Sequence, residues 1–530
     1  MGPEFNIDSI LALEKRIEEG IGDVIQLKRA RNSLLNISTC VPPEILGHIF
    51  RWNVIPEGEF GGLGKDSYNF LLVCHHWFQV ASRTPALWSF WGVNPKQWSQ
   101  RYRRSGTAPL DLVLNAYYGM RGTNASHFDG PLRDALRDRA ASDSLRSVHL
   151  QGLDTALLRS VISLLTPGDG NIRCSGIESL ILRSVNLDFS DFLACYHFPK
   201  LRNLRLSTCA GISSWDLLKL QSTFLTALSL KFGATSRNLP SSQLHSILAS
   251  YPNLQYLSLC QAAIPQDAGN GSTTRVALRH LKKLHLEGDC RCVFQLLDRL
   301  EYPDTLDHVG LELLESAPEG ISKSLAPYLQ DRIRRDDRFQ ARLGIRVSSK
   351  PGLILFKIDT LGEFNVPATP QMWNGHPSMS FRALFRETLP RKIEETLYND
   401  LVALTPRERV VGFAGGLSTR TMRDLVAAMP NIEDLSLVDS VVSDVFLQPD
   451  PPSRAKLLPS LRRLFLGRFT LQNDHDWSPL INYLTHQTSG GQAISLRLSG
   501  DQPPVPPEVA RVIEDLVEEF NIGYPGEDGK

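Results

Sequence analysis

The sequence lacks a charge excess, a membrane span and a secretory signal. Its 57 basic and 57 acidic residues give a formal net charge of zero, so no overall field draws it to nucleic acid or an anionic membrane. No window approaches the roughly 18 uninterrupted apolar residues of a membrane span. The first residues have no basic stretch followed by an apolar run. We therefore expect an intracellular protein, cytoplasmic or nuclear, without nucleic-acid or membrane partners.

Metal and redox motifs are missing as well. The eight cysteines form no CxxC pair and have no histidines at zinc-finger spacing. Cys74, His75 and His76 are consecutive, but consecutive helical positions point about 100° apart and do not easily chelate one ion. Cys290 and Cys292 are expected in a buried turn between a strand and a helix. The sequence predicts reduced thiols, no cofactor and no metal.

The motifs of common enzyme classes are also absent, with no G-x-S-x-G elbow and no H-E-x-x-H. The segment GGLGKDS resembles a phosphate-binding loop, but Glu59 stands where the first glycine belongs and Asp66 where a hydroxyl belongs. Basic residues gather in an expected turn at 101–106 and along an expected helix at 332–342. Neither run alternates with aromatic side chains. These observations favour a binding protein over an enzyme.

An amphipathic helical arm is predicted over residues 1–36. Apolar residues recur at roughly heptad spacing among charged ones, at Ile10, Leu13, Ile17, Val24, Leu27 and Leu34. Gly20 and Gly22 interrupt the pattern. Two half-helices and a weak coiled-coil arm both fit it, and the arm either packs on the next domain or self-associates.

A bundle of short helices is predicted over residues 37–100. In VPPEILGHIF, at 41–50, paired prolines fix φ for a first helical turn, and Glu44 places negative charge at its positive end. The apolar residues that follow are expected on one helix face, namely Ile45, Leu46, Ile49 and Phe50. An exposed apolar helix start indicates a partner, although packing against the N-terminal arm is an alternative.

A second helix of this bundle is predicted to end at Pro85. Its apolar residues repeat at spacings of three and four, at Phe70, Val73, Cys74, Trp77, Val80 and Ala81. Leu87 and Trp88 then fold back onto this helix. The interior of the bundle is therefore expected to be rich in aromatic side chains.

An internal repeat governs most of residues 101–500. The pattern L-x-x-L-x-L, with Ile or Val substituting, begins at residues 145, 177, 201, 225, 254, 281, 306, 432 and 461, and more weakly near 494. Successive starts are about 24 to 32 residues apart, which is typical of leucine-rich repeats. Such units stack into a solenoid with parallel strands on the concave face and helices on the convex face. Helices are expected at 241–251 and 293–300.

The period fails between 315 and 425. Degenerate repeats with longer strands are the preferred interpretation, since IRVSSKPGLILFKI still alternates, and an insertion is the alternative. Residues 501–530 form an acidic tail, in which PEVARVIEDLVEEF is expected to be a helix that caps the last apolar edge of the array.

The segments VPPEILGHIF and LLVCHHWFQVASRTPALWSF resemble an F-box, whose pattern opens with Pro-x-Glu-Ile-Leu and later carries Val-Cys-x-x-Trp and Leu-Trp. About 110 residues, with the flanking segments, are similar to F-box-like proteins of mushroom-forming fungi. The resemblance implies binding to a Skp-type adaptor and through it to a cullin. It assigns the adaptor-binding role to Val41, Pro42, Pro43, Glu44, Ile45, Leu46, Ile49, Phe50, Val73, Cys74, Trp77, Leu87 and Trp88.

The predicted fold class is therefore α+β, with a small helical F-box followed by an α/β leucine-rich repeat solenoid. The predicted function is that of a non-catalytic subunit of a Skp, cullin and F-box ubiquitin ligase. In that role the repeats would bind a target protein whose identity the sequence does not give. A repeat protein that acts as a binding scaffold, outside ubiquitin transfer, is the alternative.

Overall fold

The protein is described from a computed structural model. The described residues are 41–54, 69–91, 98–115, 144–153, 172–173, 176–184, 196–209, 218, 223–232, 239–261, 263–265, 275–304, 306–315, 342–350, 353–361, 378–385, 410–416, 429–438, 458–467, 477–499 and 505–523, with isolated positions within 15–26 and 327–335. The chain divides into two compact units, Met1–Leu225 and Thr226–Lys530, called unit 1 and unit 2 here. Their boundary lies inside the predicted array, 101–500.

Most of the predicted N-terminal arm lies outside the described residues. The described positions of that arm, Lys15, Glu19, Gly20, Asp23, Val24 and Gln26, are helical. Gly20 is itself helical, so the predicted interruption does not lie at Gly20.

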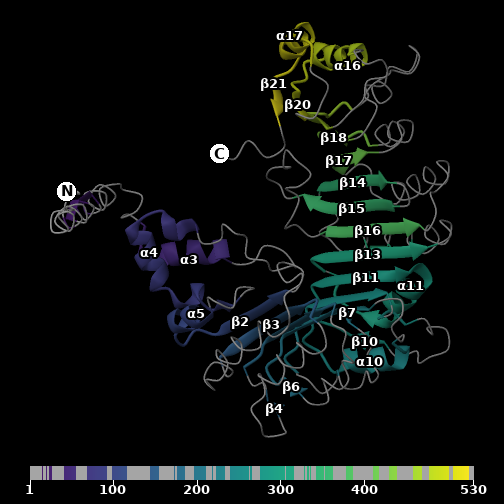
Figure 1. Ribbon diagram of the computed structural model, residues 1–530. Helices are drawn as coiled ribbons and strands as arrows, with labels where there is room; N and C mark the ends of the chain where they lie inside the picture. Colours follow the sequence, from purple (N-terminus) through teal and green to yellow (C-terminus); the bar gives the residue numbers. More distant parts are fainter. Residues whose placement is uncertain are drawn as a thin grey trace, which may run out of the picture. The chain divides into compact units, whose positions relative to one another are not determined.

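Unit 1 contains a bundle of short helices (Figure 1). They are α3 (Pro43–Val54), the 3-10 helix η1 (Asn69–Leu72), α4 (His75–Ser82) and the 3-10 helix η2 (Pro85–Leu87). The core of this bundle consists of Leu46, Phe50, Phe70, Val80, Ala81, Leu87 and Trp88. The rings of Phe50 and Phe70 stack with centroids 4.4 Å apart, and the Trp77 ring tilts against Phe50 at 5.1 Å. The aromatic interior predicted from the sequence is therefore present.

Side chains fix where the helices of the bundle begin and end. Cys74 is the N-cap of α4, and its sulfur accepts a hydrogen bond from the Trp77 backbone N–H at 3.5 Å. Past the end of the helix, the Trp88 indole Nε1 donates to the Ala81 carbonyl at 2.8 Å. This bond holds the Leu-Trp segment against α4, in the folded-back position that the sequence predicts.

The basic run at 101–106 is a helix and not the predicted turn. Helix α5 (Trp98–Ser105) contains most of it and ends at Gly106, which has a φ of 54°. Glycine adopts this left-handed conformation without strain and so commonly ends helices. The run also has local partners, because Arg101 Nη1 donates to the Phe90 carbonyl at 2.8 Å and the Arg104 guanidinium lies 4.4 Å from the Trp88 ring centroid.

A parallel sheet follows the bundle in unit 1. Its strands pair in the order β1 (Phe90–Trp91), β2 (Leu110–Asn115), β3 (Leu145–Gln151), β5 (Ser179–Arg183) and β7 (Asn203–Cys209). Short strands β4 (Ile172–Arg173) and β6 (Tyr196–His197) form a separate parallel pair. Leu180 and Leu182 alternate into the core on β5, and Ile177 joins them from the turn before it. This is the burial that the L-x-x-L-x-L spacing predicts.

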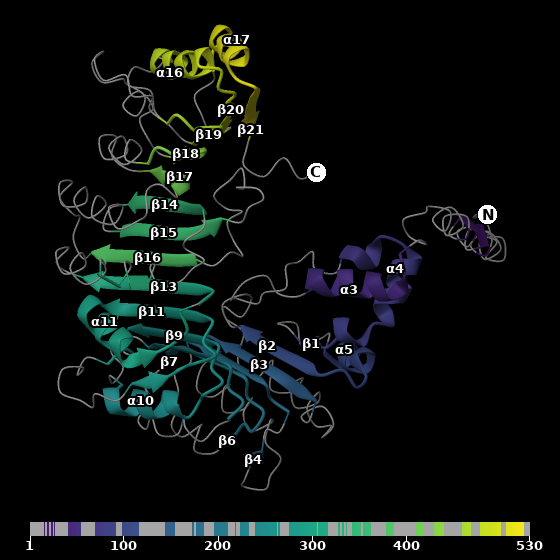
Figure 2. The ribbon, with the colours of Figure 1, turned by 180° about the vertical axis from the view of Figure 1, so that it is seen from behind.

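Unit 2 begins with four parallel strands in sequence order, and the last three of them are labelled in Figure 2. They are β8 (Ala227–Phe232), β9 (Tyr256–Gln261), β11 (Lys283–Asp289) and β13 (His308–Glu315). Helices α10 (Ser241–Ala249) and α11 (Cys290–Arg299) follow β8 and β11, close to the predicted ranges. Cys290 is buried at the start of α11, in the strand-to-helix position expected for it. Strands β10 (Val276–Ala277) and β12 (Leu300–Glu301) form a short parallel pair of their own.

The region between 315 and 425 contains the longer strands that the preferred interpretation predicted, but one of them runs antiparallel, so this region is an insertion and not a series of degenerate repeats. Strand β16 (Ser378–Phe385) pairs with β13 in parallel, but β15 (Leu353–Leu361) runs antiparallel to both β16 and β14 (Arg342–Lys350). Only Pro351 and Gly352 separate β14 from β15, and so short a connection permits only antiparallel pairing.

Parallel pairing resumes after the insertion. The remaining strands pair in the order β14, β17 (Val410–Gly416), β18 (Asp434–Val438), β19 (Arg463–Gly467), β20 (Ser495–Ser499) and β21 (Glu519–Gly523). Helices α16 (Ser478–Ser489) and α17 (Pro507–Leu516) pack against each other. The segment predicted as an acidic tail thus contains the expected helix, but this helix ends at Leu516, and Glu519 and Phe520, predicted to continue it, begin a further sheet strand.

At the coarsest level the fold class is as predicted, because the chain combines helices with largely parallel sheets. Among the residues described, no helix is long and apolar enough to cross a membrane.

Candidate functional site

Among the described residues, the helical bundle of unit 1 exposes five large apolar side chains. Leu72 is 85% exposed, Val73 55% and Ile45 50%, and Ile49 and Phe78 are also exposed. We call these five the exposed apolar residues of the bundle. Apolar side chains that stay exposed on one small bundle are candidates for contact with a partner.

Helix α3 shows how this exposure arises. Leu46 and Phe50 lie four residues apart and point into the bundle core, while Ile45 and Ile49 form a second row one position earlier and remain exposed. The four residues share one helix face, as predicted, and Ile45 is exposed, as expected for the apolar helix start; the bundle core covers only the row of Leu46 and Phe50. Neighbouring helical positions are separated by about 100°, so a single core contact cannot bury both rows.

The thirteen residues assigned by resemblance to adaptor binding divide into three groups. Pro42, Pro43, Glu44, Ile45, Ile49 and Val73 are exposed; Val41, Cys74 and Trp77 are partly buried; Leu46, Phe50, Leu87 and Trp88 are core residues. Val41 and Trp77 pack against that core. The bundle thus brings the assigned residues together, but only the first two groups offer atoms to a partner.

Sequence reasoning missed Leu72 and Phe78. Phe78 does not fit the spacing of three and four that joins Trp77, Val80 and Ala81, and a large apolar residue outside the core stripe is the signal that would have found it. Leu72 precedes Val73 in a 3-10 turn that exposes both side chains.

No protein-family model and no curated protein matches this chain. The function proposed below therefore depends on the motifs and geometry of this chain alone.

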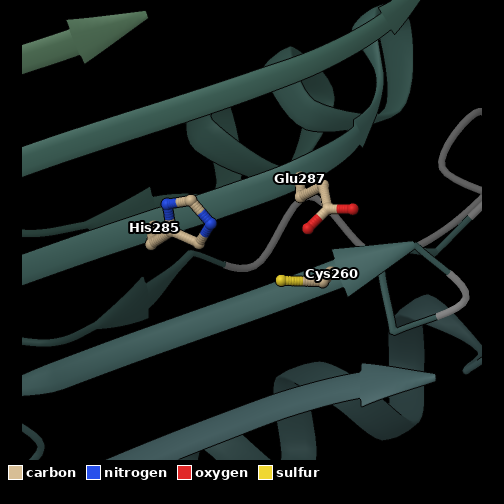
Figure 3. Close-up of side chains that lie close together, drawn as sticks. All are labelled: Cys260, His285 and Glu287. Carbon is tan, nitrogen blue, oxygen red and sulfur yellow. The ribbon is translucent and has the colours of Figure 1, made fainter. Parts of the chain in front are cut away.

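Unit 2 carries a second cluster, on the polar face of its sheet. Cys260 on β9 and Glu287 on β11 are direct cross-strand partners, and His285 lies two residues before Glu287 on the same face (Figure 3). One donor atom from each of the three residues lies within 4.8 Å of the others. The leucines that alternate with them, such as Leu259 and Leu286, are buried on the opposite face.

Glu287 is only 6% exposed and both of its carboxylate oxygens have partners. Lys231 Nζ donates to Oε2 at 2.8 Å, and Gln261 Nε2 donates to Oε1 at 3.1 Å. Burial raises the pKa of the carboxyl, but the hydrogen bonds and the positive charge of Lys231 outweigh it, so the pKa of Glu287 is lowered. Glu287 is therefore a buried carboxylate that stays ionised.

Cys260 is a buried thiol beside this carboxylate. Burial raises its pKa to about 12, and the nearby negative charge of Glu287 adds to the effect. The Ser258 hydroxyl lies 3.8 Å from the sulfur. The hydrogen bond with Ser258 and the positive charge of Lys231 lower the pKa, but burial outweighs both, so the thiol stays protonated near neutral pH.

The repeat register could have located this cluster. The residue that directly follows each L-x-x-L-x-L motif lies on the polar face, and for four successive repeats it is Lys231, Cys260, Glu287 and Glu312. These residues are cross-strand partners in that order. Aligning the repeats therefore brings together ionisable residues that are about 25 to 29 residues apart in the sequence.

His149, on β3 of unit 1, is a buried ionisable group that belongs to neither site. Burial lowers its pKa to about 4, and the positive charges of Arg183 and Arg205 on the next two strands contribute. The imidazole is therefore neutral at physiological pH.

Proposed function

We propose that this protein is a non-catalytic substrate receptor of a Skp, cullin and F-box ubiquitin ligase. Its helical bundle would bind a Skp-type adaptor, and its repeats would form a leucine-rich repeat array that binds a target protein. The observation that carries the proposal is the second apolar row of α3, Ile45 and Ile49, which the bundle core leaves exposed.

The exposed row has the properties of a docking surface. Fully burying an isoleucine side chain contributes roughly 1.5–3 kcal/mol, and both isoleucines are about half exposed in the free chain. They follow the paired prolines at the start of α3, where the backbone is already restricted. A preorganised helix start loses little conformational entropy on binding. The F-box resemblance names a Skp-type adaptor as the partner that fits this surface.

The repeats support a role in target binding. The parallel strands β8, β9, β11 and β13 bury leucines on one face and carry polar or charged residues on the other, among them Lys231, Glu287 and Glu312. A continuous polar face of this kind can recognise a protein surface through charge and hydrogen bonding. The ubiquitin-transferring residues would belong to partner proteins, with this chain supplying proximity.

The test is co-expression of the full chain with a Skp-type adaptor, followed by size-exclusion chromatography. We expect a one-to-one complex with the native chain and its loss in the double variant Pro42→Ala, Ile45→Asp. The matched control is Val512→Asp, because Val512 is an apolar helix residue with similar exposure in unit 2. That variant should keep the complex.

Two results would contradict the proposal. A folded native chain that forms no complex would favour the scaffold alternative, in which the repeats act outside ubiquitin transfer. A complex that survives the double variant would show that the adaptor binds elsewhere. The proposed complex would act in the cytoplasm or nucleus, the compartments expected from the sequence.

A further inference from the structure

We propose that Cys260, His285 and Glu287 form a binding site for Zn²⁺ on the polar face of the unit 2 sheet. The proposal does not depend on adaptor binding, since it concerns other residues in the other unit.

The donor set is the one that zinc prefers. Zinc in proteins is bound by cysteine sulfur, histidine nitrogen and carboxylate oxygen, and the cluster supplies one of each. A hard cation such as Mg²⁺ or Ca²⁺ would require oxygen ligands only. The combination of a thiol and an imidazole therefore selects a borderline-soft divalent ion.

The geometry needs only a small adjustment. Bonds of about 2.0–2.3 Å in a tetrahedral site place donor atoms roughly 3.3–3.8 Å apart. In this structure the three donor atoms lie within 4.8 Å of one another. The donor atoms come from two hydrogen-bonded strands in fixed register. Rotation of the three side chains therefore has to shorten the distances between the donor atoms. Figure 3 shows the Cys260 sulfur and the His285 ring on the same side of the two strands, with Glu287 beside them.

The ionic contacts of the cluster leave room for a metal. The bonds from Lys231 and Gln261 use one acceptor position on each oxygen of Glu287, and a carboxylate has about four such positions. Glu312, the cross-strand partner of Glu287 on β13, adds further negative charge. The Cys260 thiol also forms a hydrogen bond with the Glu287 carboxylate, and a bound metal would take the place of the thiol proton.

Binding would exchange a proton for the metal. The Cys260 S–H bond breaks, the sulfur donates its electron pair to Zn²⁺, and the proton goes to solvent. His285 binds as a neutral imidazole and Glu287 as a carboxylate. Three protein ligands leave one tetrahedral position for water or for a group of a bound partner.

Lys231 should compete with the ion. It is the nearest cation to Glu287, and its ammonium group both occupies an oxygen of the carboxylate and repels a divalent ion. Replacing Lys231 with methionine should therefore tighten zinc binding. If the cluster were only an ionic network, the same substitution would simply remove the ion pair between Lys231 and Glu287.

The experiment is a titration of the chelator-treated, reduced full chain with ZnCl₂, followed by calorimetry, and with CoCl₂, followed by absorption. We expect one zinc per chain and a cobalt–thiolate charge-transfer band. Cys260→Ser, His285→Gln and Glu287→Gln should each weaken zinc binding more than about tenfold, and Cys260→Ser should abolish the band. Lys231→Met should tighten binding about tenfold, which corresponds to about 1.4 kcal/mol.

Two control variants test whether other thiols or imidazoles are responsible. Cys292→Ser and His486→Gln remove a partly buried cysteine and histidine outside the cluster, and neither should change the titration. Circular dichroism establishes that each variant is folded. If a ligand variant fails to fold, Lys231→Met still tests the proposal, because it keeps all three ligands. Equal zinc binding by the native chain and the ligand variants would overturn the proposal. So would a native cobalt complex without a thiolate band, or a Lys231→Met chain that binds zinc no more tightly.

Discussion

Ile45 and Leu46 are neighbours in the chain, yet Ile45 is 50% exposed and Leu46 is 2% exposed. The two side chains have similar size and hydrophobicity, so the difference reflects position on α3 alone. Leu46 belongs to the core that holds the bundle together, whereas Ile45 belongs to the surface proposed to bind the adaptor. Substitutions at these two positions should therefore separate folding from binding.

Leu46→Ala should destabilise the bundle by about 2–5 kcal/mol, because it leaves a cavity beside Phe50. Ile45→Ala should change the free energy of unfolding by about 0.5 kcal/mol or less, as is usual for surface substitutions. Urea unfolding followed by tryptophan fluorescence measures both. Equal destabilisation by the two variants would place Ile45 in the core and remove it from the docking surface.

Unit 1 should lose stability as the pH falls from 6.5 toward 4, through His149. The folded state keeps this histidine neutral down to about pH 4, whereas the unfolded chain takes up a proton near the ordinary value of 6.5. The unfolded state therefore binds more protons in this window and is favoured, by up to roughly 3 kcal/mol at the acid end.

The measurement is hydrogen exchange of the β3 amides at several pH values, in the native chain and in His149→Gln. Other groups also titrate over this range, so the difference between the two slopes isolates the histidine. A variant with the same slope as the native chain would show that His149 is accessible to protons in the folded state.

Gly106→Ala should destabilise the end of α5 by about 1 kcal/mol. Gly106 has a φ of 54°, and a side chain there is strained although a Cβ would meet open space. Gly106→Asn is the matched comparison, since asparagine tolerates the left-handed conformation better, and it should cost less. Thermal unfolding of both variants measures the difference, and an asparagine variant less stable than the alanine variant would exclude this explanation.

The C-terminal helix should behave as part of the folded unit. Ile513 on α17 is fully buried and its neighbour Val512 is exposed, so Ile513→Ala should cost about 2–4 kcal/mol and Val512→Ala should be nearly neutral. Limited proteolysis of the segment after α16 reports this directly. Cleavage there should accelerate only in the Ile513 variant, and equal cleavage in both variants would mean that α17 does not dock.

Local patterns were sufficient to predict much of this structure. The L-x-x-L-x-L spacing gave strands such as β5, with Leu180 and Leu182 inward, because alternation along a strand is a property of a few consecutive residues. The bundle was also predicted, although the periodicity did not separate the two apolar rows of α3. A spacing of three and four assigns neighbouring positions to one face, and only the packing of η1 and α4 decides which row is buried.

Non-local pairing was the part that the sequence could not give. The short connection at 351–352 implies that β14 and β15 pair antiparallel, but no local pattern shows that β16 pairs with β13 or that β14 pairs with β17. The convergence of Cys260 with Glu287 is also non-local, and it becomes visible only once repeats are aligned in register. The order of the strands within the insertion depends on which sheet edges are still unpaired when these strands join the sheet. No local spacing of residues encodes that order.

The insertion has a consequence for how unit 2 folds. In the regular runs each strand pairs with one that follows it within roughly one repeat, so structure can grow from neighbour to neighbour. Across the insertion, His308 pairs with Ser378 and Leu343 with Val410, so two wide loops must close together. Closing a loop more than twice as long costs only about 0.8 kcal/mol more, but contacts between distant residues form slowly. We expect folding to pause at β13, with the segments before and after the insertion behaving as separate cooperative blocks.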